Sequence, residues 1–109
     1  MSTNGRTIHR TSHPHIVTID GVCGGRAIIE GTRIAVWHIV GLYYKLGMSV
    51  EEILLDWDYL NPAEIFSALA YYHDNREEIE RDRWENSYEY WKEHYLNVEN
   101  YQSTLSQNI

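Results

Sequence analysis

Two capping boxes constrain how this chain can fold more than any other feature of its sequence. In a capping box, the side chain before a helix accepts a hydrogen bond from the backbone three residues on, and a Glu at that position bonds back. Ser49-Val-Glu-Glu52 and Asn61-Pro-Ala-Glu64 both have this form, and Pro62 stands at the first helical position. The sequence therefore predicts two consecutive helices, a short one after Ser49 and a longer one over residues 62–75.

A third helix and a small β element are predicted upstream. Apolar residues recur at steps of three and four over Ile34–Leu46, which indicates a helix. His15–Ile19 and Arg26–Ile29 are short β-branched runs on either side of the turn-rich segment Asp20–Gly25, a pattern typical of a hairpin. Residues 1–14 are polar and are predicted to form a flexible arm. The fold class is therefore mainly α, with a helix-turn-helix core over residues 15–75.

An aromatic stripe follows this core. Trp84, Tyr88, Trp91 and Tyr95 are spaced by four, three and four residues, which predicts an amphipathic helix over residues 76–96. Because large aromatic side chains are costly to leave in water, the stripe either packs on the chain's own core or forms a subunit interface. We favour an interface, in a homodimer or with another protein. The polar residues 97–109 are predicted to be a tail.

Composition limits the class of protein. With 109 residues, of which 43% are hydrophobic and 23% charged, the chain fits one folded domain. Cys23 stands alone, so no internal disulfide can form, which favours a reducing compartment. The longest apolar run, Ile34–Tyr44, is too short to span a membrane. We expect a cytoplasmic protein without a membrane partner.

The charges are divided between the two halves of the chain. The net charge is −7, yet residues 1–48 carry five basic residues against two acids, and residues 49–109 carry four against fourteen. The predicted helix over 62–75, which would read DNA in a helix-turn-helix, contains neither Arg nor Lys. If DNA is bound, the phosphate contacts are expected from the basic residues of the first half, which are Arg6, Arg10, Arg26, Arg33 and Lys45.

No catalytic or metal site is predicted. His13 and His15 are the one closely spaced histidine pair, and with Cys23 they fall short of the four ligands of a structural zinc site. No nucleophile, base and oxyanion donors fall into a recognisable arrangement. The turn at Gly21–Gly25 leads into a strand and has no phosphate-loop Lys, so we interpret it as a hairpin turn. We expect neither enzymatic activity nor a cofactor.

Five segments together resemble a bacterial family, domain of unknown function 433. They are His13–Ile16, Gly21–Gly25, Ile29–Ile34, Gly47–Ile53 and Ala68–Tyr72. The resemblance implies a homeodomain-like, three-helix helix-turn-helix fold preceded by a small β element. It also implies kinship with VapB-type antitoxins, whose partners are PIN-like nuclease toxins. The aromatic helix lies outside the shared region.

These observations predict an antitoxin-like, non-enzymatic protein of a bacterial toxin–antitoxin system. It would form a homodimer, bind a PIN-like nuclease toxin through its acidic C-terminal half, and contact operator DNA through its basic N-terminal half. Two alternatives stay open: a stand-alone DNA-binding transcriptional regulator, and a structural homodimerisation module without a nucleic-acid role.

Overall fold

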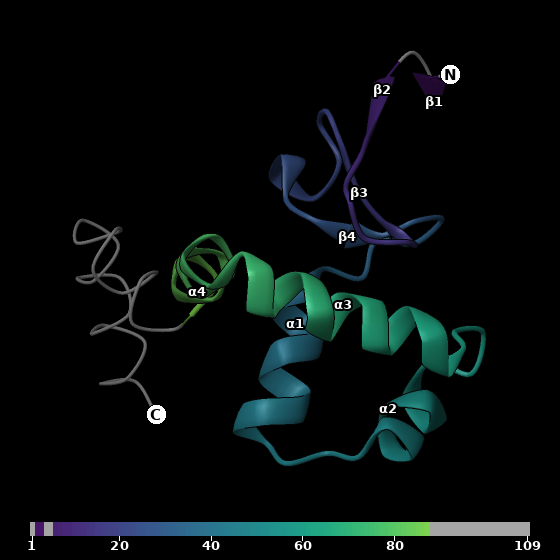
Figure 1. The fold of residues 1–109 in the computed structure, drawn as a ribbon, viewed down its shortest axis with the longest axis vertical. Coiled ribbons are helices and arrows are strands. Elements are labelled where there is room, and N and C mark those ends of the chain that lie inside the picture. The colour runs from purple at the N-terminus through teal and green to yellow at the C-terminus, as the bar shows by residue number, and fades with distance from the viewer. Residues whose placement is uncertain (1, 4–5, 88–109) are drawn as a thin grey trace, which may run out of the picture.

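The computed structural model describes residues 2–3 and 6–87, as a small antiparallel sheet set on one side of a group of helices (Figure 1). The strands are β1 (Ser2–Thr3), β2 (Arg6–Arg10), β3 (Ile16–Ile19) and β4 (Ile28–Ile29), with a 3-10 turn, η1 (Cys23–Gly25), between the last two. The helices are α1 (Val36–Val40), its π-helical continuation η2 (Gly41–Lys45), α2 (Val50–Asp56), α3 (Pro62–Asp74) and α4 (Arg76–Glu85).

The sheet has the strand order β1-β2-β3-β4, and each pair is antiparallel. The predicted hairpin is confirmed, since Val17 of β3 pairs with Ile28 of β4. The prediction of a flexible arm over residues 1–14 is wrong for Arg6–Arg10. These residues form β2, which pairs with the other edge of β3 and places Ile8 opposite Ile19. Backbone hydrogen bonds to β3 hold β2 in place. Ile8 is the one apolar residue of β2, so the sequence shows no alternation of apolar and polar residues that would predict a strand there.

Both capping boxes are confirmed. The Ser49 hydroxyl accepts from the Glu52 backbone N–H at 3.1 Å, and the Glu52 carboxylate accepts from the Ser49 N–H at 2.8 Å. The Asn61 side chain accepts from the Glu64 N–H at 3.0 Å, and the return bond is 2.9 Å. Each box satisfies N–H groups that the helix itself leaves without partners, which is why α2 and α3 begin where they do.

The core surrounds α1. Val36, Ile39 and Val40 are fully buried, and Ile53 of α2 and Ile65 of α3 pack in the same cluster. Phe66, although apolar and next to the buried Ile65, is 55% exposed. On α3 the buried face runs through Ile65, Leu69 and Tyr72, and position 66 lies off that face. The arrangement is mainly α, as predicted.

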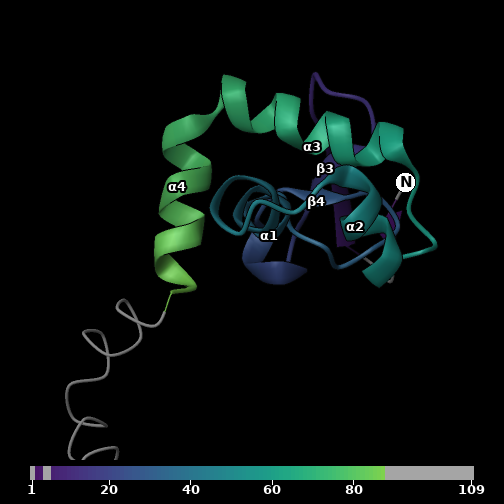
Figure 2. The same cartoon turned by 90° about the horizontal axis from the view of Figure 1, so that it is seen from below.

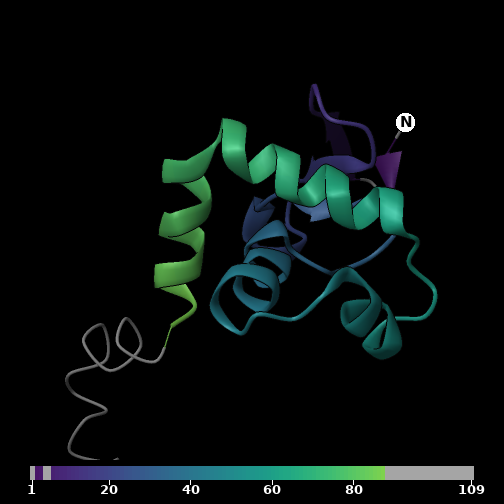
Figure 3. The same ribbon diagram turned by 60° about the horizontal axis from the view of Figure 1, so that its bottom comes forward.

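The helix α4 crosses the end of α3 beside α1 (Figure 2, Figure 3). The prediction of one helix through residue 96 is wrong, because α4 ends at Glu85. Asn86 donates from its side chain to the Asp82 carbonyl at 2.7 Å, and the Ser87 hydroxyl donates to the Trp84 carbonyl at 2.6 Å. These bonds satisfy carbonyls of the last turn. Tyr88, Trp91, Tyr95 and residues 97–109 lie outside the described residues.

Ile79, with no exposed surface, is the apolar residue that anchors α4, whereas Trp84 is 45% exposed. The hydroxyl of Tyr71 donates to Glu78 at 3.0 Å and that of Tyr72 donates to Glu80 at 2.6 Å, so α3 and α4 are also joined by hydrogen bonds. The described part of α4 is thus an integral part of the core.

Replacing Ile79 with Ala is expected to lower the free energy of unfolding by about 2–5 kcal/mol, because it leaves a cavity between α4 and the core. Urea unfolding monitored by tryptophan fluorescence measures the change. Arg81→Ala, at an exposed position of the same helix, is the control and is expected to change stability by less than about 0.5 kcal/mol. Equal effects of the two changes would show that α4 is not packed as described.

Candidate functional site

Arg10, one of the five basic residues expected to contact phosphate, is held in an internal ion pair. Its guanidinium donates two hydrogen bonds to the Glu30 carboxylate, at 2.9 and 2.7 Å, and so ties β2 to the turn after β4. The hydrogen bonds from Arg10 lower the pKa of Glu30 and raise that of Arg10. Because its charge is already matched by a carboxylate, Arg10 is a poor phosphate contact.

Arg26 is bound to α4. Its Nη2 donates to Glu85 Oε1 at 3.0 Å, and its Nε lies 3.5 Å from Asp82 Oδ1. Gly24 allows this placement, because a side chain there would collide with the Arg26 guanidinium. Asp82 is only 8% exposed, and burial raises its pKa to about 6 against the opposing effect of Arg26. Arg26 therefore connects the β3–β4 loop to α4. It is not available for the phosphate contact that the sequence predicts.

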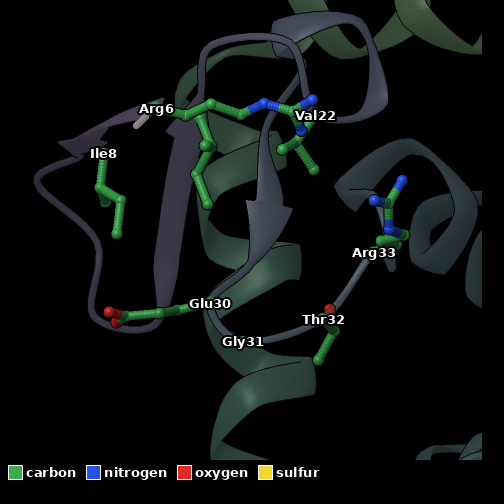
Figure 4. A pocket seen from close by; sticks show the side chains of 8 residues that line it. Arg6, Ile8, Val22, Glu30, Gly31, Thr32 and Arg33 are labelled. Carbon is green, nitrogen blue, oxygen red and sulfur yellow. The ribbon is translucent and has the colours of Figure 1, made fainter. Parts of the chain in front are cut away.

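Arg6 and Arg33 line one cavity of about 440 Å³ between the sheet and the turn after β4 (Figure 4). Its lining residues are Arg6, Ile8, Ile19, Val22, Glu30, Gly31, Thr32 and Arg33. Among the described side chains, no carboxylate lies within ion-pair distance of either arginine. The structure thus brings together two of the five predicted cations, and neither of these two is held in an ion pair with a described carboxylate.

The turn that carries Arg33 is tightly defined. Gly31 has a φ of +83°, a left-handed conformation that favours glycine. The Thr32 hydroxyl donates to the Ile29 carbonyl at 2.7 Å and accepts from the Ile34 N–H at 2.9 Å. Thr32 does not cap the following helix, because α1 begins later, after Ala35. Its hydroxyl stabilises the turn instead, and this places Arg33 at the cavity.

Lys45 lies apart from this cavity, at the end of η2. The pKa of Glu80 is lowered mainly by the hydrogen bond from the Tyr72 hydroxyl, then by Arg83, and least by Lys45. A second cavity of about 280 Å³ has Lys45 and Arg83 among its lining residues. Lys45 therefore belongs to the helical part of the surface, near α4, and does not extend the pair formed by Arg6 and Arg33.

His13, His38, His73 and Cys23 each contact different residues and do not form one site. His13 Nε2 lies 2.8 Å from Asp74 Oδ2, and His73 Nε2 lies 2.7 Å from the Tyr44 hydroxyl. His38 stacks on Trp37, and burial lowers its pKa. The Cys23 thiol donates to the Arg33 carbonyl at 3.5 Å. Within residues 6–87, no three His, Cys, Asp or Glu side chains are grouped as metal ligands would be.

The predicted DNA-reading helix, α3, has several of its polar side chains engaged in local contacts. Glu64 completes the capping box, His73 contacts Tyr44, and the Asn75 amide at its end donates to the Tyr71 carbonyl. No base-reading cation was expected on this helix, and none lies within Pro62–Asp74. In the structure, α3 serves the core and its neighbouring helices.

Exposed apolar side chains collect in a part of the chain that we call the apolar–acidic segment, residues 44–66. Its exposed large hydrophobic residues are Tyr44, Leu46, Leu55, Tyr59 and Phe66, and Leu55 is the most exposed, at 82%. The same segment carries five acids and one base, Lys45. Figure 1 shows that η2 and α2 of this segment lie at the end of the molecule opposite the sheet.

Sequence reasoning missed this segment and the apolar walls of the Arg6–Arg33 cavity. One signal was present: Leu54 and Leu55 are adjacent, and neighbouring residues of a helix cannot both face one core. The structure half-buries Leu54 and exposes Leu55. The cavity could not be predicted, because residues 1–14 are predicted to be a flexible arm and no sequence pattern places Arg6 near Arg33.

No helix in the part of the chain that the structure describes is both long and apolar enough to cross a membrane. The family model described as protein of unknown function (DUF433) matches residues 16–72. A crystal structure of a DUF433 member protein from Anabaena variabilis ATCC 29413, at 2.00 Å resolution, is 38% identical and covers 63% of this chain and 67% of that chain, with a TM-score of 0.60. A comparison with curated proteins gives no significant match. The matched region includes Arg33 and the apolar–acidic segment but not Arg6 or α4.

The buried Asp82 predicts a specific pH dependence of stability. Its pKa of about 6 in the folded protein lies above the value near 4 of an unfolded chain, so the folded protein binds more protons between these values. The contribution of Asp82 is therefore most favourable below about pH 4 and is lost as the pH rises through about 6.

We expect the free energy of unfolding of the wild type to gain about 1–2 kcal/mol relative to Asp82→Asn as the pH falls from about 7 to about 4. Urea unfolding of both proteins at several pH values measures this difference. Asp58→Asn, which removes an exposed carboxylate, controls for the loss of one charge. Parallel pH profiles for the wild type and Asp82→Asn would contradict the assignment.

Proposed function

This chain belongs to the family described as proteins of unknown function (DUF433), and from its surface we propose that it is an antitoxin-like, non-enzymatic protein. Its partner would be a basic protein, a PIN-like nuclease toxin, held by the apolar–acidic segment. The observation that carries the proposal is the exposure of Leu55, at 82%, between acids on α2 and in the α2–α3 connection. Large apolar side chains grouped on a surface are typical of protein interaction sites.

The charge of the segment supports a basic partner. Glu51, Asp56 and Asp58 are exposed beside Leu55 and Tyr59, and Lys45 is the one base of the segment. A nuclease that acts on RNA must present a basic surface to the phosphate backbone. Exposed acids next to exposed apolar side chains match such a surface in charge, and would cover it.

Two further parts of the proposal concern assembly and DNA. The chain would form a homodimer with Trp84, Tyr88, Trp91 and Tyr95 among its contacts, although α4 ends at Glu85 and they do not line one continuous helix. Operator binding would depend on the cations that internal ion pairs leave available, Arg6, Arg33 and Lys45. Because α3 has neither Arg nor Lys, and Arg10 and Arg26 are paired with carboxylates, we favour a protein partner over a stand-alone DNA-binding regulator.

The first test is affinity purification of the tagged full chain from its native host, with and without nuclease treatment, followed by native mass spectrometry. The expected result is a stoichiometric basic protein whose ribonuclease activity the chain inhibits when the two are mixed. Recovery of the chain alone, or of a partner whose nuclease activity it leaves unchanged, would contradict the antitoxin proposal.

In the reconstituted complex, replacing both Leu55 and Tyr59 with Ser is expected to weaken binding by at least about tenfold, because buried apolar anchors carry much of the energy of an interface. Both side chains are exposed in the free chain, so the thermal unfolding midpoint should change little. Ala70→Ser, at an exposed position of α3 outside the segment, is the matched control. Unchanged affinity of the double variant would place the interface elsewhere.

Neutralising the acids tests the charge argument separately. The triple variant Glu51→Gln, Asp56→Asn, Asp58→Asn is expected to slow association and to flatten its dependence on salt concentration, because the acids steer a basic partner. Glu77→Gln, which removes an exposed acid on α4, is expected to leave the association rate and its salt dependence nearly unchanged. Stopped-flow measurements at several salt concentrations give both quantities. An unchanged salt dependence would remove these acids from the interface.

A further inference from the structure

The Arg6–Arg33 cavity has features of a ligand site that the proposed function does not use. Its volume of about 440 Å³ lies within the range of small-molecule sites, roughly 300–1,000 Å³. One wall is aliphatic, formed by Ile8, Ile19 and Val22 from β2, β3 and the loop after it. The polar groups are few and come from the turn after β4 and from Arg6. An apolar wall with a small number of charged groups is typical of a site for an organic ligand.

The two arginines differ from their neighbours in having no internal carboxylate. Arg10 is matched by Glu30, and Arg26 is matched by Asp82 and Glu85. Among the described residues, Arg6 and Arg33 have no such partner. Glu30 also lines the cavity, but its charge is compensated by the two hydrogen bonds from Arg10. The cavity therefore carries two positive charges in excess.

The positions of both arginines are set by the backbone around them. Arg6 is the first residue of β2 and pairs with Thr3 of β1, and its guanidinium lies over Gly21, where an added Cβ would be 3.4 Å from Arg6 Nε. Arg33 follows the turn that the Thr32 hydroxyl holds with two hydrogen bonds. Figure 4 shows the Arg6 side chain extending toward Val22 and the Arg33 guanidinium on that same side, with the Glu30 carboxylate on the other side. The backbone at both positions is therefore fixed, and binding would have to order only the two exposed side chains.

We propose that this cavity binds a small organic phosphate monoester, with its phosphate on Arg6 and Arg33 and its apolar part on Ile8, Ile19 and Val22. A phosphate monoester carries a charge of about −1.5 to −2 at neutral pH, which matches two guanidinium groups better than a single carboxylate does. Guanidinium groups bind phosphate oxygens through paired hydrogen bonds. The proposal is independent of the protein partner, because Arg6, Ile8, Ile19 and Arg33 all lie outside the apolar–acidic segment.

The test is isothermal titration calorimetry of the full chain with three probes: phenyl phosphate, inorganic phosphate and benzoate. Phenyl phosphate is expected to bind in a saturable manner and more tightly than either of the others, because only it offers both a dianion and an apolar ring. Binding of inorganic phosphate with equal affinity would overturn the organic part of the proposal. Absence of saturable binding by phenyl phosphate would overturn all of it.

Three variants that each remove one positive charge locate the site. Arg6→Gln and Arg33→Gln are each expected to weaken phenyl phosphate binding by at least about tenfold, because a charge-assisted pair of hydrogen bonds is lost. Arg81→Gln, at an exposed position on α4, is the matched control and should leave the affinity within about twofold, since α4 does not line this cavity. An equal effect of all three variants would indicate nonspecific attraction and would overturn the proposal.

The apolar wall and the alternative ligand need separate measurements. Ile8→Ser is expected to weaken phenyl phosphate binding without changing the affinity for inorganic phosphate. Backbone amide shifts from two-dimensional NMR should change on titration at Gly21 and Gly31–Arg33, also in the Arg81→Gln protein. If duplex DNA binds in a manner that depends on Arg6 and Arg33 and phenyl phosphate does not compete, the cations serve a nucleic-acid backbone and the small-ligand proposal is wrong.

Discussion

The burial of α1 is the constraint on which the rest of the structure depends. Val36, Ile39 and Val40 have no exposed surface, and α3 and α4 both pack against this one helix of five residues. The sheet is joined to the same point, because the Val36 N–H donates to the Ala27 carbonyl at 3.0 Å. Neither a two-residue β4 nor a seven-residue α2 would be stable alone. Each is held because its apolar residues, such as Ile29 and Ile53, complete the cluster around α1.

Ion pairs then determine what the basic residues can do. The N-terminal half has an excess of positive charge, and two of its arginines are neutralised within the fold, Arg10 by Glu30 and Arg26 by acids of α4. The Arg26 contacts join segments about sixty residues apart in the chain, since the separation from Glu85 is 59. They also place the carboxylate of Asp82 where burial raises its pKa to about 6. What remains available is a pair, Arg6 and Arg33, beside an aliphatic wall.

Two surfaces of different character follow from this arrangement. The apolar–acidic segment covers η2, α2 and the start of α3, and its η2 and α2 lie at the end of the molecule opposite the sheet (Figure 1). The Arg6–Arg33 cavity lies between the sheet and the turn that follows it (Figure 4). An acidic apolar surface suits a basic protein, and a cationic cavity suits a small anion. Since the two surfaces share no residues, substitutions in one can be studied without altering the other.

Local features were determined by the sequence alone. Capping residues and apolar spacing act within a few residues of the chain. They explain the starts of α2 and α3, the pairing of β3 with β4 and the helix before Gly47. Other features were decided only by the tertiary structure. They are the strand at Arg6–Arg10, the end of α4 at Glu85, the exposure of Leu55 and Phe66, and the ion-pair partners of Arg10 and Arg26. Each of these depends on a neighbour distant in the chain: β2 on an edge of β3, and Arg26 on carboxylates of α4. Local propensity cannot encode such a neighbour, because the contact exists only after the chain has folded around α1.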